Sequence, residues 1–292
     1  MRWKKVQGQG DMEDRRGQGG GMLGGGGALP IPMGKGAGGL GILIAIIAAV
    51  LLGGNVLGGG ADSGFSPGSG LQPSQPASSG SEAERGDDDL FEFTKFVSKD
   101  AQDMWTQIMS STDRQYPRAP VVTFTGGTQT GCGPASSASG PFYCPADNKV
   151  YLDLSFAREL SRRFGAPGDF AWAYVIAHEI GHHVQTVLGI EAEVRQKQQS
   201  DPGDANLYLV RLELQADCFA GVWAHSSYQR GTLEEGDIEE GLTAASAVGD
   251  DRLGARSPEQ WTHGSAALRT EWFRKGFESG DPGACDTGSV DI

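Results

Sequence analysis

The sequence predicts an α+β protein, with a mainly helical fold and a small antiparallel sheet, preceded by one transmembrane helix. Three observations support this prediction. Residues 171–190 and 211–224 carry apolar side chains at helical spacing, short β-branched runs lie between residues 121 and 154, and residues 39–57 form an uncharged apolar run. The 292 residues allow one large or two small domains, although 46 unevenly distributed glycines reduce the part that can fold.

The N-terminal third of the chain indicates a membrane anchor. Residues 1–38 carry long Gly runs without hydrophobic periodicity and are predicted to be a disordered basic tail. Gly39–Leu57 has the length of a bilayer-spanning helix, although a signal peptide cleaved near Gly58–Ala61 is an alternative. Basic residues precede this segment and acidic residues follow it. The positive-inside rule therefore predicts a cytoplasmic N-terminus, with the bulk of the chain on the extracytoplasmic side of the inner membrane.

Charge and composition divide the rest of the chain. Residues 58–87 are rich in Ser, Gly and Pro, which predicts a flexible linker before a working domain of residues 88–292. Residues 1–58 hold six basic and three acidic side chains, so the remainder carries a net charge of −16 within the total of −13. A surface of that charge repels phosphate backbones, and we expect no nucleic-acid partner.

The sequence of the working domain predicts helices around a few strands. An N-cap at Asp88 or Asp89 opens a helix that runs to about Ser110. The strands and loops expected next are a strand at 121–125, a Gly/Ser-rich loop at 126–140 and a hairpin formed by 142–144 and 149–154. The remaining elements are a short helix at 155–164, a helix that Asp169 caps and Gly189 ends, a mobile loop at 191–205, a helix from Asp237 through Val248, and a last helix capped by Ser265.

The helix at residues 171–190 contains His178, Glu179 and His182 in the arrangement HExxH. Positions four apart share one helical face, so both imidazoles can bind one ion. Glu179 lies beside that face and can reach a water molecule as a general base. Zinc is the expected ion, and a third protein ligand with one open position would make the site catalytic. A chance match on an amphipathic helix is the alternative.

A second helix supplies two carboxylates. Glu213 and Asp217 are also four residues apart, among apolar neighbours. In such a pair one carboxylate can bind the metal, and the other can accept the free ring N–H of a histidine ligand. We assign Glu213 to the metal and Asp217 to the orientation of a ligand. A solvated acidic face is the alternative.

Four segments in order carry a resemblance to a known family: HEIGHH, ELQADCFAG, GDDRLG and WTHGSAALRTEWF. Together they make residues 89–286 resemble the neutral zinc metallopeptidase family of bacterial envelope proteins. The chain is more distantly similar to the HtpX and CAAX-prenyl-protease zincins, in which a Glu from an ExxxD helix completes a helical HExxH. The resemblance implies a zincin-like fold and one zinc ion on His178, His182 and Glu213, with Glu179 as catalytic base. In zincins an edge strand beside the metal helix also receives the extended peptide.

The last of these segments implies one more functional histidine. In the HtpX and prenyl-protease relatives a His at the matching position, supported by an Arg, faces the substrate. The resemblance therefore implies that His263 stabilises the oxyanion and that Arg269 holds His263. A capping or packing histidine is the alternative. His183 is rotated off the ligand face and is interpreted as a polar neighbour, and His225 receives no role.

The four cysteines fit two disulfides, for which three pairings exist. We favour Cys132–Cys144, which closes a flexible loop beside the hairpin, and Cys218–Cys285, which ties the C-terminus to the helix of Glu213. A cysteine-zinc site is the alternative, although no CxxC spacing supports it.

The function predicted from these features is that of a membrane-anchored, zinc-dependent metalloendopeptidase acting on peptides or unfolded proteins. The alternative from another class is a catalytically silent, zinc-binding envelope adaptor or binding module. A structural zinc site would require a fourth protein ligand, for which the sequence offers no clear candidate.

Overall fold

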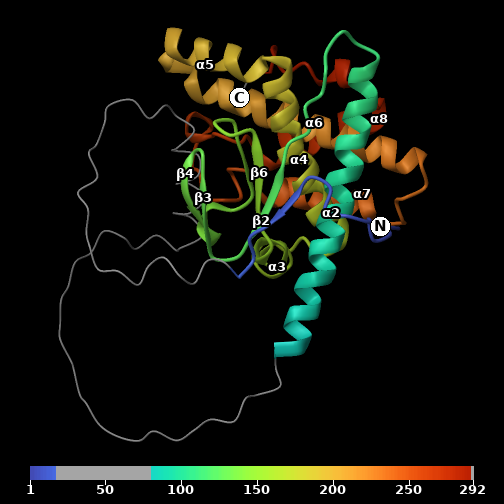
Figure 1. Cartoon of the computed structure of the whole chain (residues 1–292). Coiled ribbons are helices and arrows are strands. Elements are labelled where there is room, and N and C mark those ends of the chain that lie inside the picture. The colour runs from blue at the N-terminus through green and yellow to red at the C-terminus, as the bar shows by residue number, and fades with distance from the viewer. Residues whose placement is uncertain (18–79, 291–292) are drawn as a thin grey trace, which may run out of the picture.

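A mainly helical α+β fold surrounds one central helix (Figure 1). The computed structural model describes residues 1–17 and 80–290. The helices are α2 (Gly80–Ser110), α3 (Ser155–Arg162), α4 (Asp169–Leu188), α5 (Ile190–Ser200), α6 (Ala205–Gln229), α7 (Asp237–Ala247) and α8 (Ala266–Ser279). The strands are β1 (Met12–Asp14), β2 (Val121–Phe124), β3 (Gly127–Thr130), β4 (Gly133–Ser136), β5 (Phe142–Cys144) and β6 (Lys149–Asp153).

The main sheet is mixed and not antiparallel, which corrects the prediction. Its strand order is β1-β2-β6-β5, with parallel pairs β1–β2 and β2–β6 and an antiparallel hairpin β5–β6. β2 and β6 run the same way because the chain between them forms a second, two-stranded sheet, β3–β4, before it turns into β5. The Gly/Ser-rich segment expected to be a loop is therefore largely this β3–β4 hairpin. β5 is left at one edge of the main sheet.

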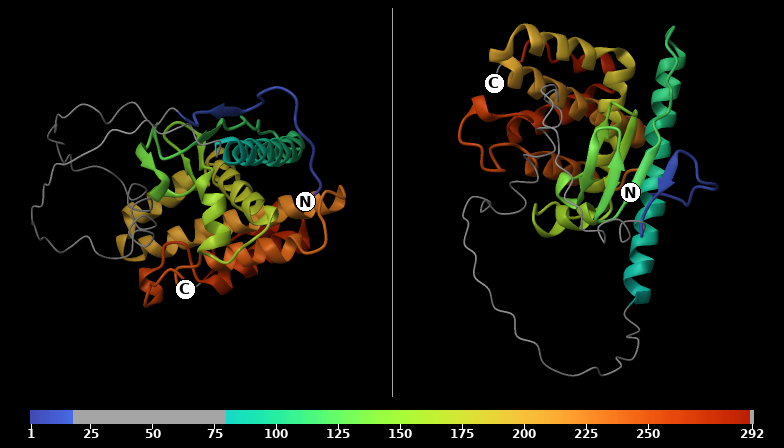
Figure 2. Two further views of the ribbon diagram at one scale, coloured as in Figure 1. Left: turned by 90° about the horizontal axis from the view of Figure 1, so that it is seen from below. Right: turned by 60° about the vertical axis from the view of Figure 1, so that its left-hand side comes forward.

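α4 lies at the centre of the fold, between the sheet and the helices α6, α7 and α8 (Figure 2). Most of its side chains are buried, including Phe170, Trp172, Tyr174 and Ile176. A helix that is apolar on nearly every face has to be surrounded by other elements. Gly189 ends α4 with a left-handed φ of 83°, as the sequence predicts, and α5 follows directly. Residues 191–205, predicted to be a mobile loop, are thus mostly helix.

α6 and α8 approach each other at two glycines. A Cβ atom at Gly221 would lie 2.1 Å from the carbonyl oxygen of Phe273, and one at Gly276 would lie 2.0 Å from that of Cys218. Only glycine fits where two helix backbones come this close. The disulfide Cys218–Cys285 also ties the segment after α8 to α6. This packing sets Arg269 of α8 against the buried face of α6.

Residues 1–17, which we call the N-terminal arm, pack against the folded body, so the prediction of a disordered tail is wrong for them. The ring of Trp3 lies 5.5 Å from that of Phe93 on α2. β1 extends the main sheet beside β2, and Lys149 of β6 contacts Glu13 at 2.8 Å. The sequence does not reveal this strand, because it is short and polar and because its partner β2 lies more than a hundred residues further along the chain.

Two further predictions concern the chain between the arm and the body. The predicted transmembrane helix Gly39–Leu57 lies outside the described residues, as does most of the predicted linker. Residues 80–87, assigned to that linker, belong to α2 instead. Within residues 1–17 and 80–290, no helix combines the length and apolar character of a membrane span.

Candidate metal centre

α4 brings His178 and His182 together, because side chains four residues apart on a helix lie one above the other. Their Nε2 atoms are 3.1 Å apart. The buried environment of α4 leaves both rings little freedom, and Nδ1 of His182 lies 2.9 Å from Oε1 of Gln185, one turn further along the same helix. The two Nε2 atoms therefore point at a common position.

Glu213 reaches the same position from α6. Its Oε2 lies 3.2 Å from Nε2 of His178, and its Oε1 lies 3.4 Å from Nε2 of His182. One donor atom from each of these three residues lies within 4.8 Å of the other two. Two imidazole nitrogens and a carboxylate that converge in this way form the donor set of a catalytic zinc site. The residues present therefore fit a zinc ion.

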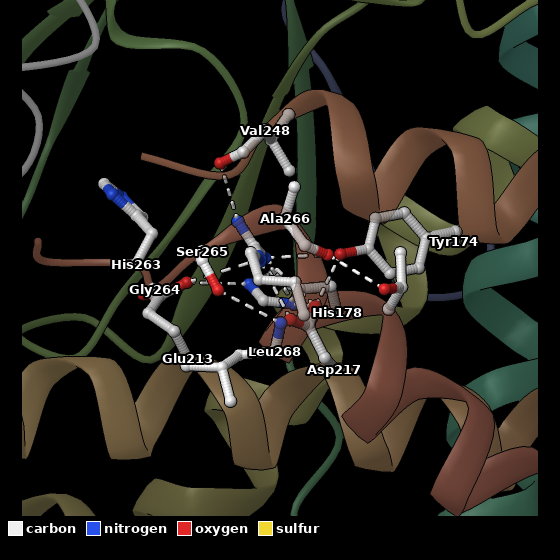
Figure 3. Close-up of polar contacts among 12 residues, drawn as sticks. Tyr174, His178, Glu213, Asp217, Val248, His263, Gly264, Ser265, Ala266 and Leu268 are labelled. Carbon is white, nitrogen blue, oxygen red and sulfur yellow. Dashed lines mark hydrogen bonds and ion pairs between the residues drawn. The ribbon is translucent and has the colours of Figure 1, made fainter. Parts of the chain in front are cut away.

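Asp217 lies behind His178, one turn along α6 from Glu213. Its Oδ1 is 2.8 Å from Nδ1 of His178, so it meets the ring nitrogen that faces away from Glu213. Tyr174 donates its hydroxyl to the same oxygen at 2.5 Å. Figure 3 shows Tyr174, His178 and Asp217 converging. A carboxylate at this nitrogen fixes the tautomer and the orientation of a histidine ligand.

Arg269 contacts Asp217 and not His263, which corrects one part of the sequence analysis. Its Nε and Nη2 atoms donate to the two oxygens of Asp217 at 2.8 and 3.0 Å, and Nη2 also donates to the hydroxyl of Tyr174 at 3.2 Å. The predicted support of His263 depended on the resemblance, and α8 instead turns Arg269 toward α6. The guanidinium therefore neutralises the buried carboxylate behind His178.

Glu179 is buried next to the ligand group and lines the same cleft. Burial raises the pKa of its carboxyl above the usual value, although the nearby charges of His178 and His182 oppose this. A carboxylate with a raised pKa is a stronger base than an exposed one. Glu179 is not one of the three converging donors, so it is available for proton transfer.

The charges of the ligand group depend on one another. Burial lowers the pKa of His178, but Asp217 and Glu213 outweigh it and raise that pKa to about 10. Burial likewise raises the pKa of Glu213, but His182 and His178 hold it well below its usual range. In the absence of a metal ion, a proton on His178 thus balances the carboxylates. A divalent cation replaces this proton, because only the neutral ring binds metal.

His263 stands apart from the cluster of Tyr174, His178 and Asp217 (Figure 3). Its side chain is nearly buried and lines the cleft. Its partner is Asp250, whose Oδ1 lies 3.1 Å from Nδ1 of His263. Sequence analysis assigned no role to Asp250, although it lies in the segment GDDRLG that carries the family resemblance. It also missed Tyr174, although the four-residue spacing to His178 was a usable signal.

The cleft above the ligand group has a sheet edge as one wall. β5 lies at the edge of the main sheet beside α4, and Tyr143 and its neighbours Pro141 and Phe142 line the cleft. The disulfide Cys132–Cys144 ties the turn between β3 and β4 to β5. α5 and the start of α6 form another wall, with Val194, Leu209 and Leu212. The cleft therefore presents apolar side chains and an unpaired strand edge.

The other two histidines have structural contacts. His183 is buried on α4, where its Nε2 lies 2.6 Å from the carbonyl oxygen of Pro117 and its Nδ1 lies 3.2 Å from the hydroxyl of Tyr143. The Nδ1 atom of His225 lies 2.7 Å from the carbonyl oxygen of Phe277. A second group of carboxylates, Asp169, Asp237 and Glu240, could also hold a cation by geometry. The α-ammonium group of Met1 already meets the first two of these, at 2.9 and 3.3 Å.

Comparison with known proteins identifies relatives of the whole chain. Residues 1–288 match a family described as "Putative neutral zinc metallopeptidase". The uncharacterized protein YpfJ of Escherichia coli K12 is 44% identical over 296 residues, covering 98% of both chains. The uncharacterized protein Rv2575 of Mycobacterium tuberculosis H37Rv is 48% identical over 191 residues, covering 60% of this chain and 64% of its own. No solved structure matches the chain.

Proposed function

Because the chain belongs to the neutral zinc metallopeptidase family, we propose that it is a zinc-dependent metalloendopeptidase that hydrolyses peptide bonds with Glu179 as general base. One observation carries the proposal: the donor atoms of His178, His182 and Glu213 converge within 4.8 Å beside the buried Glu179. A purely structural zinc site would have no use for an uncoordinated carboxylate beside its three donors.

The proposed chemistry divides between the ion and two side chains. When bound, zinc supplies Lewis acidity, which lowers the pKa of water to about 7 and polarises a carbonyl group. Glu179 takes a proton from the attacking water and later delivers it to the leaving amine. Its buried position, which raises its pKa, suits a group that both accepts and returns a proton. His263 donates a hydrogen bond to the oxyanion that forms on the substrate carbonyl.

We propose that β5 receives the substrate. It is the strand at the edge of the main sheet that lies beside α4. The backbone N–H of Tyr143 lies close enough to the Glu179 carboxylate to oppose part of the rise in its pKa that burial causes. An extended peptide that adds to this edge would be held by backbone hydrogen bonds with little regard to its sequence. The apolar walls of the cleft favour substrates with apolar side chains near the cleaved bond, as unfolded proteins offer.

The location of the protein belongs to the proposal as well. All four cysteines are paired, and disulfides persist in oxidising compartments outside the cytoplasm. We therefore propose an extracytoplasmic peptidase domain that Gly39–Leu57 attaches to the inner membrane, with residues 1–17 on the same side as the domain because β1 belongs to its sheet. The net negative charge of the chain argues against a nucleic-acid partner.

Cleavage of a mixed peptide library by the zinc-loaded full chain tests this function. We expect Glu179→Gln to lower the turnover by at least about 100-fold, because the variant has no general base. Bound zinc should stay equal to that of the wild type, because Glu179 is not one of the converging donors. Glu191→Gln is the matched control, since this carboxylate also lines the cleft but lies beside Arg195 and away from the ligands. Zinc binding without cleavage by the wild type would support the silent adaptor instead.

A further inference from the structure

Asp250 makes contacts that a surface turn does not require. It is 5% exposed, and its Oδ2 accepts the backbone N–H groups of Thr262, His263 and Gly264 at 2.7, 2.7 and 3.0 Å. Its own backbone N–H donates to the carbonyl oxygen of Gly264 at 2.9 Å. One carboxylate oxygen therefore holds the whole turn that carries His263.

The other oxygen of the same carboxylate meets the His263 ring. Oδ1 lies 3.1 Å from Nδ1, and the hydroxyl of Thr262 lies 3.0 Å from the same nitrogen. The hydrogen bond and charge of His263 lower the pKa of Asp250 against the effect of burial, so this carboxylate is ionised at neutral pH. An ionised carboxylate keeps a hydrogen on Nδ1, so Nε2 can donate into the cleft only from a ring with a hydrogen on both nitrogens, whose positive charge the carboxylate balances.

His263 also lies within electrostatic reach of the ligand group. Its charge is among the influences that lower the pKa of Glu213, and both side chains line the same cleft. The ring is thus near the place where a substrate carbonyl would meet the ion. A hydrogen-bond donor at such a place contributes only if its direction is fixed before the substrate arrives.

We propose that Asp250 is a positioning residue for the peptidase reaction: it fixes both the turn of residues 262–264 and the His263 ring, so that Nε2 meets the oxygen of the scissile carbonyl. This inference rests on the proposed function. The alternative is that Asp250 only stabilises the turn, and the two roles can be separated because they use different oxygens of one carboxylate.

Asp250→Asn separates them. The amide oxygen of Asn can still accept the three backbone N–H groups, so the turn is kept. Its NH₂ group then faces Nδ1 of His263, which has to become an acceptor, so the ring can donate through Nε2 only as a neutral and therefore weaker donor. The matched control is Asp251→Asn. Asp251 is the next residue in the chain and accepts the backbone N–H of Ala266 at 2.7 Å at the start of α8, but it is exposed.

We expect Asp250→Asn to lower kcat by about 10- to 100-fold with KM within about threefold, by analogy with the loss when a residue that orients a metal-binding histidine is removed. Asp251→Asn should stay within about twofold of the wild type. Asp250→Asn should add no further loss in a His263→Ala background, because its effect passes through that ring. Zinc content and thermal unfolding of each variant check that the fold is intact.

Two results would overturn the inference: an unchanged kcat in Asp250→Asn, or losses that multiply in the double variant. Long-range ¹H–¹⁵N NMR spectra of the His263 ring provide a measurement without turnover. They should show a hydrogen on Nδ1 in the wild type and no hydrogen on Nδ1 in Asp250→Asn. If the wild type cleaved nothing but this difference at Nδ1 were observed, the proposed function would fail while the control of the ring by Asp250 would stand. The same state of Nδ1 in both proteins would refute that control.

Discussion

Replacing Arg269 with Met should destabilise the protein more than replacing any charged residue on its surface. Arg269 is 3% exposed and donates twice to Asp217, which is fully buried, as well as to Tyr174 and to the carbonyl oxygen of Val248. Met has a similar length, so the main loss is the charge and the hydrogen bonds. Removing one partner of a buried ion pair costs about 3–5 kcal/mol, because the other charge is left without compensation. For a folded body of this size the cost corresponds to a Tm about 6–20 °C lower.

The same change should weaken the metal site. Asp217 orients His178, and loss of the guanidinium frees the carboxylate to move or to take a proton. Zinc affinity should fall by about 10- to 100-fold, although none of the three donors is altered. Calorimetry measures the unfolding, and competition with a coloured chelator measures the affinity.

Lys99→Met is the control for this experiment. Lys99 also pairs with a carboxylate, Asp103, but both side chains are 48% exposed on α2. A pair of this kind contributes less than about 1 kcal/mol. If Arg269→Met cost no more than Lys99→Met, or if it left zinc affinity unchanged, the argument that a buried guanidinium supports the ligand group would be refuted.

Two further predictions concern the N-terminal arm and the pH dependence of metal binding. Trp3→Ala should lower the free energy of unfolding by about 1–3 kcal/mol, because the ring packs on Phe93 and Phe96. Replacing the exposed Lys4 with Ala should leave that free energy unchanged. Equal denaturation curves for both variants would support the predicted disordered tail instead. The pKa of His178 lies above its usual value, so its protonation stabilises the zinc-free protein below about pH 6.5, and this contribution is lost as the pH rises toward 10. Zinc should therefore displace a proton and bind more tightly as the pH rises from 7 to 9. Calorimetry in two buffers of different ionisation enthalpy counts that proton, and a count of zero would contradict the charge balance.

The ligand group could be predicted because its signals are local. His178 and His182 share one helix, and so do Glu213 and Asp217, so helical periodicity alone puts each pair on one face. What periodicity does not give is which helices meet. Arg269 contacts Asp217, and Asp250 contacts His263 in the place expected for Arg269, because these contacts depend on how α8 packs on α6 and on the turn before α8. The two glycines that allow this packing do not show in the sequence which helices will meet.

Two elements were missed for a different reason. β1 is a strand of three mostly polar residues, and only its hydrogen bonds to β2 define it. α5 was read as a loop because it has no apolar face, yet it consists largely of good helix formers and is supported by the pair Glu191–Arg195 at a spacing of four residues. Hydrophobic patterns in a sequence do not reveal helices or strands that bury few side chains.

The N-terminal arm also restricts how the protein can be arranged at a membrane. Strands that exchange backbone hydrogen bonds must share one aqueous compartment, and β1 belongs to the same sheet as β2, β6 and β5. In a chain folded in this way, residues 1–17 and 80–290 lie on the same side of any bilayer. If the peptidase domain is extracytoplasmic, as proposed, the N-terminal arm lies outside the cytoplasm with it, whereas the charge pattern predicts a cytoplasmic N-terminus.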